Sequence, residues 1–74
     1  MDLNKEEAEY LLKVGRNIKK LRKAKKLKQV ELAYAADLDR QSIYRIETGQ
    51  LNLTLKTLHR LAKALGVTIK DFVE

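Results

Sequence analysis

The sequence has no cysteine and no proline among its 74 residues. Without cysteine it forms no disulfide and no thiolate metal site, and nothing in it favours an oxidising compartment. Its one histidine, His59, has no partner for a metal, so we expect this side chain to pack at the edge of an apolar helix face. No apolar run approaches the roughly 20 residues that span a bilayer, and the acidic N-terminus lacks a signal-peptide core. We expect a cytoplasmic protein with no metal and no membrane partner.

The sequence also lacks the features that an enzyme needs. We interpret residues 1–74 as a single domain, which is too small to hold both a hydrophobic core and a deep substrate cavity. The sequence contains no glycine-rich phosphate loop and no paired catalytic carboxylates. Ser42 is the only serine, and no arrangement around it suggests a nucleophile. The sequence therefore predicts a protein that is not an enzyme and that has no cofactor and no small-molecule ligand.

Positive charge is abundant and unevenly placed. The formal net charge is +6, and nine of the 16 lysine and arginine residues lie between Lys13 and Lys28. One interpretation is a polyanionic partner, since a basic stripe is the electrostatic footprint of nucleic-acid binding. The other is a solvated helix that uses lysine for helicity and solubility. Composition alone does not separate the two.

Apolar residues recur at three- and four-residue spacing almost throughout, which is typical of amphipathic helices. The pattern predicts helices over 5–25, 29–36, 40–48 and 55–65, followed by a short helix after Thr68. Residues 1–10 are assigned to an N-terminal extension of the first helix, with Asn4 as its expected N-cap. Expected caps and stops at the later boundaries are Asp39, Gly49, Thr54 and Gly66. The predicted fold is a compact, all-α, five-helix domain.

The segment 40–48 carries the most specific functional signal. At about 100° per residue, Arg40, Gln41, Tyr44 and Arg45 share one face, while two isoleucines face the opposite side. That polar face has no acidic residue. Arginine presents paired donors to guanine, and glutamine both donates to and accepts from adenine. We therefore expect this helix to read base edges in the major groove of double-stranded DNA.

The segment Gln29-Val30-Glu31-Leu32-Ala33 through Ile43-Tyr44-Arg45-Ile46-Glu47-Thr48-Gly49 resembles the helix-turn-helix of the lambda-repressor/Cro-like (XRE) family. Ala64-Leu65-Gly66-Val67 is similar to the exit of that family's fourth helix, and the resemblance covers about residues 18–73. It implies a lambda-repressor-like fold with the helix-turn-helix at the second and third helices. Leu38-Asp39-Arg40 and Asn52-Leu53-Thr54 look most like small controller proteins of restriction-modification systems, while phage and plasmid repressors remain open.

The resemblance also implies residue roles. Arg40, Gln41, Tyr44 and Arg45 match base-reading and groove-lining positions, and Arg22 and Glu47 match a structural pair joining the first and third helices. Gln29 resembles a residue that bonds a phosphate and buttresses the first reading residue. Residues expected at the DNA backbone are Gln29, Ser42, Thr48, Asn52, Lys28 and Lys56. In the family, glycine commonly stands where this chain has Lys26 and Asp37.

The expected function is sequence-specific regulation of transcription by a homodimer on a palindromic operator. A domain of this size reads few base pairs alone, so two copies are needed for useful specificity. We expect the dimer to form through Ile69, Phe72 and Val73. The alternative is an antitoxin-type module that binds a toxin partner and binds DNA secondarily, for which residues 1–10 are the only spare segment.

Overall fold

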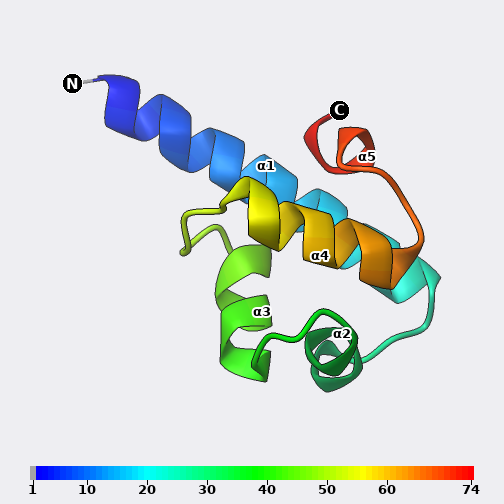
Figure 1. Cartoon of the computed structure of the whole chain (residues 1–74). Helices are drawn as coiled ribbons and strands as arrows, with labels where there is room; N and C mark the ends of the chain where they lie inside the picture. Colours follow the sequence, from blue (N-terminus) through cyan, green and yellow to red (C-terminus); the bar gives the residue numbers. More distant parts are fainter. Residues whose placement is uncertain (1) are drawn as a thin grey trace.

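The computed structural model describes residues 2–74 (Figure 1). In chain order the helices are α1 (Asp2–Ala24), α2 (Gln29–Ala35), α3 (Arg40–Glu47), α4 (Leu55–Leu65) and α5 (Lys70–Val73). No β-strand occurs within residues 2–74. The prediction of an all-α fold with five helices is therefore confirmed, and each of the middle three helices has bounds within one residue of those expected.

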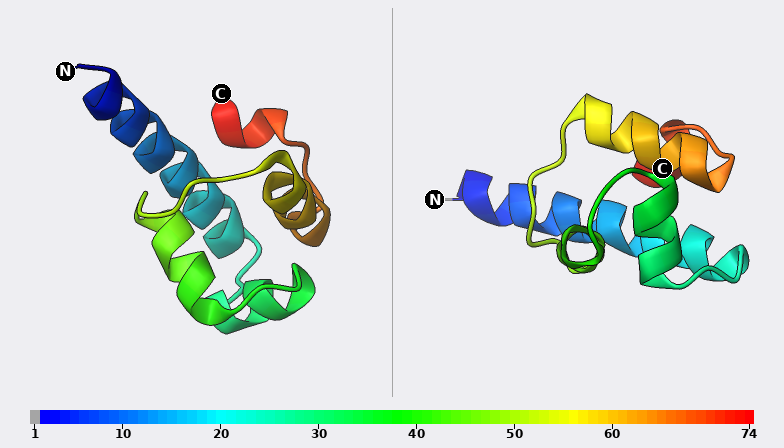
Figure 2. Two further views of the ribbon diagram at one scale, coloured as in Figure 1. Left: turned by 60° about the vertical axis from the view of Figure 1, so that its left-hand side comes forward. Right: turned by 60° about the horizontal axis from the view of Figure 1, so that its bottom comes forward.

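The first helix starts earlier than the sequence pattern indicated. α1 begins at Asp2, so Asn4 lies inside the helix and the prediction that it is the N-cap is wrong. No proline or glycine interrupts the chain before Gly15, and the early glutamates favour a helix N-terminus because they oppose the positive end of its dipole. The first turns of α1 extend past the other helices, as both views in Figure 2 show.

The core draws on every helix. α1 packs against α3 and α5, while α2 packs against α3 and α4. The largest side chains with essentially no exposed surface are Phe72, Ile18, Leu32, Ile43, Ile46, Leu61 and Leu65. His59 is exposed on α4, so the expectation that it packs at the edge of the apolar face is wrong.

α5 folds back onto the domain, and this overturns part of the expected dimer surface. The Phe72 side chain is fully buried in the core of its own chain. The Asn17 side-chain amide of α1 donates to the Phe72 carbonyl at 2.7 Å and holds α5 in place. Phe72 is therefore wrong as an interface residue, because α1 already covers it. Ile69 and Val73 lie beside it and are half-buried.

The first four helices end in the same way. After each one, a residue with positive φ reverses the chain: Lys26 (59°), Asp37 (58°), Gly49 (73°) and Gly66 (69°). At each end two backbone N–H groups return to the last turn, for example Leu27 to Arg22 at 3.1 Å and Leu38 to Ala33 at 2.8 Å. This is the Schellman arrangement, which glycine normally occupies because it has no Cβ. Lysine and aspartate occupy two of the four positions.

No helix within residues 2–74 has the length and apolar character that crossing a membrane requires.

Candidate nucleic-acid interface

α3 is fixed to the domain along one side and open along the other. Ile43 and Ile46 are 0% and 1% exposed, as the sequence pattern predicted. Arg40, Gln41, Tyr44 and Arg45 are all exposed. α3 lies at the end of the domain away from α5 (Figures 1 and 2). The helix therefore presents two guanidinium groups, an amide and a phenol to solvent on one continuous face.

The start of α3 is set by Asp39. Its carboxylate accepts the backbone N–H of Ser42 at 2.6 Å, which satisfies a donor that the helix itself leaves free. The Ser42 N–H, together with the Ser42 side chain, holds the pKa of the Asp39 carboxyl below its usual value, and the nearby charge of Arg45 adds to this effect. This cap positions the N-terminal turn, where Arg40 and Gln41 stand.

Arg22 of α1 and Glu47 of α3 form a buried ion pair. The Arg22 Nε and Nη2 atoms lie 2.6 and 3.0 Å from the two Glu47 carboxylate oxygens, and both residues are less than a tenth exposed. The third donor, Arg22 Nη1, reaches the Leu27 carbonyl at 2.7 Å in the turn before α2. One guanidinium thus ties together α1, the α1–α2 turn and the end of α3.

Gln29 joins this pair to the exposed face of α3. Its Nε2 atom donates to Glu47 Oε1 at 3.1 Å, and its Oε1 atom accepts from Arg40 Nη1 at 3.4 Å. Arg22, Glu47, Gln29 and Arg40 are therefore linked in sequence by hydrogen bonds from the core to the surface. We call these four residues the relay.

Contacts to a DNA backbone were predicted for Lys28 and Ser42, which lie at the starts of α2 and α3. Lys28 is exposed immediately before α2 and occupies its N-cap position. The lysine side chain has no acceptor atom for a helix N–H. The cap is made instead from the other side, because Glu31 accepts the Lys28 N–H at 2.7 Å. Ser42 is half-buried beside the Asp39 cap.

Thr48, also expected at the DNA backbone, is the C-cap residue of α3. Its hydroxyl donates to the Tyr44 carbonyl at 2.8 Å, so its only donor is engaged at the end of α3. A phosphate contact by Thr48 would require that bond to break. Gln50, which was not among the predicted residues, is exposed directly after Gly49 and donates to the Thr48 hydroxyl at 2.8 Å. The Gln50 amide retains a second N–H group. In the sequence, the feature that singles out Gln50 is its position directly after Gly49, the predicted end of this helix.

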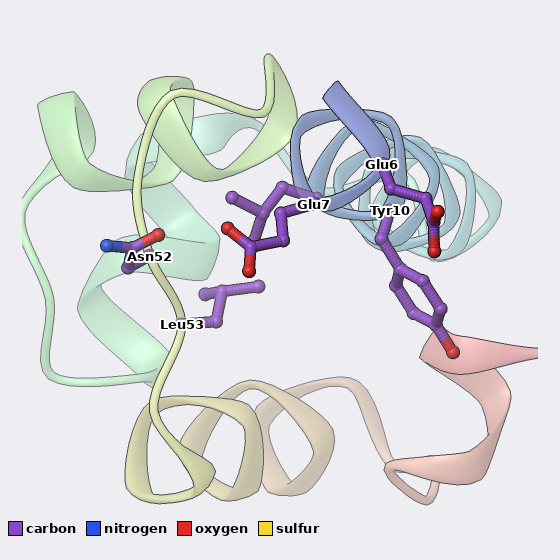
Figure 3. Close-up of a pocket in the computed structure, with 6 residues that line it drawn as sticks. Glu6, Glu7, Tyr10, Asn52 and Leu53 are labelled. Carbon is purple, nitrogen blue, oxygen red and sulfur yellow. The ribbon is translucent and has the colours of Figure 1, made fainter. Parts of the chain in front are cut away.

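Asn52 and Lys56 are exposed on either side of the Thr54 cap that begins α4. Asn52 also lines an open groove of about 600 Å³ between the segment 52–53 and the first turns of α1 (Figure 3). Glu6, Glu7, Tyr10 and Leu11 form the α1 side of this groove. The wall opposite Asn52 is therefore acidic, in contrast to the basic remainder of the chain.

Comparison with known proteins gives a consistent result. The family model described as "Helix-turn-helix" matches residues 18–72. The immunity repressor protein of Bacillus phage phi105 is 43% identical over 60 residues, a stretch that covers 81% of this chain but only 42% of the repressor. The chain thus spans less than half of that relative. The control protein C.BamHI of Bacillus amyloliquefaciens is 36% identical over 61 residues, covering 81% of this chain and 75% of that protein.

Among solved structures, the restriction-modification controller protein C.AhdI from Aeromonas hydrophila superposes with a TM-score of 0.82 at 37% identity. The match covers 84% of this chain and 94% of that chain.

Proposed function

The chain belongs to the helix-turn-helix family, and from this premise we propose that it binds a palindromic DNA operator as a dimer and regulates transcription from it. Its relatives are regulators and not enzymes. The observation that carries the proposal is the open face of α3. Arg40, Gln41, Tyr44 and Arg45 are exposed together on a helix whose isoleucines anchor it in the core.

The side chains on this face suit the major groove. A guanidinium group donates two parallel hydrogen bonds to guanine, and an amide pairs with adenine in both directions. Arg40 and Gln41 occupy the first turn of α3, the end that enters the groove in this motif. Tyr44 and Arg45 lie one turn further and reach the next base pair or its phosphate.

The surroundings of α3 supply donors for the DNA backbone. Lys28 and Gln29 stand at the start of α2, while Lys56 lies in the first turn of α4. Backbone contacts fix the register of a protein on the duplex but carry little sequence information. We assign this role also to Ser42, Thr48 and Asn52, and we add Gln50, whose amide has a second N–H.

The dimer surface is proposed along the outer edge of α5. Ile69 and Val73 are half-buried and leave apolar surface beside the buried Phe72. α5 lies away from α3, so two copies joined there leave both reading helices free (Figure 1). Light scattering coupled to gel filtration tests this. A strict monomer at high concentration, with and without DNA, would contradict it.

The similarity to the controller protein of known structure, and the Leu38-Asp39-Arg40 and Asn52-Leu53-Thr54 segments, support a controller-type regulator. We propose that it acts in the cytoplasm. This subtype predicts restriction and modification genes beside the gene for this chain.

Selection of bound duplexes from a random pool tests the function directly. We expect a symmetric consensus with half-site centres separated by about 10 base pairs, or a multiple of that spacing. The affinity should fall steeply as salt concentration rises, because basic side chains displace counterions from phosphates. Absence of any enriched sequence would overturn the proposal.

A further inference from the structure

We propose that Glu47, at the end of α3, is a positioning residue for base recognition by Arg40 at the start of the same helix. This inference rests on the proposed function. Glu47 contacts Arg40 only through Gln29, whose amide lies between them. The observation behind it is the direction of the hydrogen bonds along the relay.

An amide has one donating end and one accepting end, whereas a carboxylate only accepts. Glu47 Oε1, at 3.1 Å from Gln29 Nε2, therefore fixes which end of the amide faces inward. The Gln29 Oε1 atom must then face outward. There it meets Arg40 Nη1 at 3.4 Å, and arginine is a side chain with donors and no acceptor. The order of donors and acceptors is consistent from the core to the surface.

Arg22 fixes the position of Glu47, the buried acceptor from which this order of donors and acceptors begins. Its two-point contact fixes both oxygens of Glu47, so the carboxylate cannot rotate away from Gln29. The pair is buried, while Gln29 is half-buried and Arg40 is exposed. A rigid, buried charge therefore orients a side chain that works at the surface. A group ordered before binding gives up less conformational freedom when it meets its base pair.

The relay uses one edge of the Arg40 guanidinium and leaves its remaining donors for guanine. If Glu47 were neutral and could both donate and accept, the Gln29 amide would be free to turn over. Its donors would then face the Arg40 donors and push the guanidinium away from its reading position. Glu47 thus influences which base is read without contacting DNA.

The experiment uses the full chain and two duplexes that differ only at the base pair where Arg40→Ala abolishes the preference. The ratio of the two dissociation constants is the readout. Glu47→Gln keeps the shape and removes the charge, and we expect it to lower the ratio about three- to tenfold, the size of one hydrogen bond. Gln29→Met should do the same. The double variant should lose no more than either single variant, because both interrupt one relay.

Glu9→Gln is the matched control. It makes the same chemical change at an exposed glutamate of α1 that lies outside the relay, so the ratio should not change. Equal weakening of both duplexes by Glu47→Gln, or additive losses in the double variant, would overturn the positioning role and leave the proposed function intact. A wild-type protein without base preference would overturn both.

If Glu47→Gln does not fold, Arg22→Lys is the variant that tests the relay. It leaves Glu47 charged but replaces the two-point clamp with a single ammonium group. Thermal unfolding shows whether each variant is folded at the binding temperature. The ratio should fall for Arg22→Lys as well, and an unchanged ratio in this folded variant would contradict the relay.

Discussion

Gly15 of α1 lies so close to Ile46 of α3 that a Cβ atom at position 15 would overlap the Ile46 carbonyl oxygen. The carbonyl carbon and oxygen of Glu47 are each 3.0 Å from the same position. These are backbone atoms, which cannot turn away as a flexible side chain does. The close approach of the two helices at this point seats the end of α3 on α1.

Gly15→Ala should therefore destabilise the domain by about 1–3 kcal/mol, because overpacking forces the helices apart. Helix propensity alone predicts the opposite sign, a gain of roughly 1 kcal/mol. Urea unfolding monitored by circular dichroism decides between the two effects. Lys19→Ala, at an exposed position of α1, serves as the control and should change stability by less than about 0.5 kcal/mol. A more stable Gly15→Ala protein would show that α1 and α3 are not in close contact.

Arg22→Ala should lower the free energy of unfolding by about 3–5 kcal/mol, because it leaves the Glu47 carboxylate buried and without its counter-charge. The double change Arg22→Met with Glu47→Leu removes both charges and should recover most of that loss. Denaturant unfolding measures both. If the double variant is no more stable than Arg22→Ala, the loss arises from packing and not from the unpaired charge.

Lys26→Gly should stabilise the domain by roughly 0.5–1 kcal/mol. Lys26 has a φ of 59°, where a Cβ atom meets the backbone, and glycine avoids this strain. Asp37→Gly should give a smaller gain, since aspartate tolerates this region better than lysine does.

Lys25→Gly is the matched control for these substitutions. It makes the same change one residue earlier, where φ is not positive, and should destabilise the protein. For a domain of this size, 1 kcal/mol shifts the melting temperature by about 4–8 °C, which calorimetry resolves easily. Similar melting temperatures for Lys25→Gly and Lys26→Gly would contradict the assignment of strain.

The Asp39 cap predicts a specific dependence on acid. Because the Ser42 N–H lowers the pKa of Asp39 in the folded protein, ionised Asp39 stabilises the fold above its ordinary pKa. That contribution is lost as the pH falls from about 4 through the lowered pKa. Asp39→Asn retains a capping oxygen but does not titrate. Melting temperatures between about pH 7 and pH 3 should therefore fall further for the wild type than for Asp39→Asn, and parallel curves would contradict this.

Two groups of side chains should affect DNA binding in different ways. Arg40→Ala and Gln41→Ala should each cost about 1–3 kcal/mol at the base pair they read and relax the preference there. Lys20→Ala and Lys23→Ala, exposed on α1, should weaken all sequences slightly and reduce the salt dependence. Selection from random DNA with each variant tells them apart. Unchanged base preference in the Arg40 and Gln41 variants would refute their assignment to base reading.

Much of the fold was available from local sequence signals. Ile43 and Ile46 at helical spacing indicated which side of α3 is buried, and Asp39, Gly49 and Thr54 marked helix boundaries that the structure confirms. These signals act over a few residues, so one sequence is enough to interpret them. The prediction that Asn4 is the N-cap of the first helix was wrong. No proline or glycine stands before Asn4 to end the helix there, so α1 continues to Asp2.

The sequence by itself determined that the chain is helical and that one short helix carries exposed arginine and glutamine opposite its isoleucines, because periodicity is a local property. Only the tertiary structure decided that α5 returns to bury Phe72 and that Gly15 meets a backbone carbonyl. It alone also orders the hydrogen bonds from Arg22 through Glu47 and Gln29 to Arg40. Those features depend on residues distant in the sequence, and folding alone brings them within reach of one another.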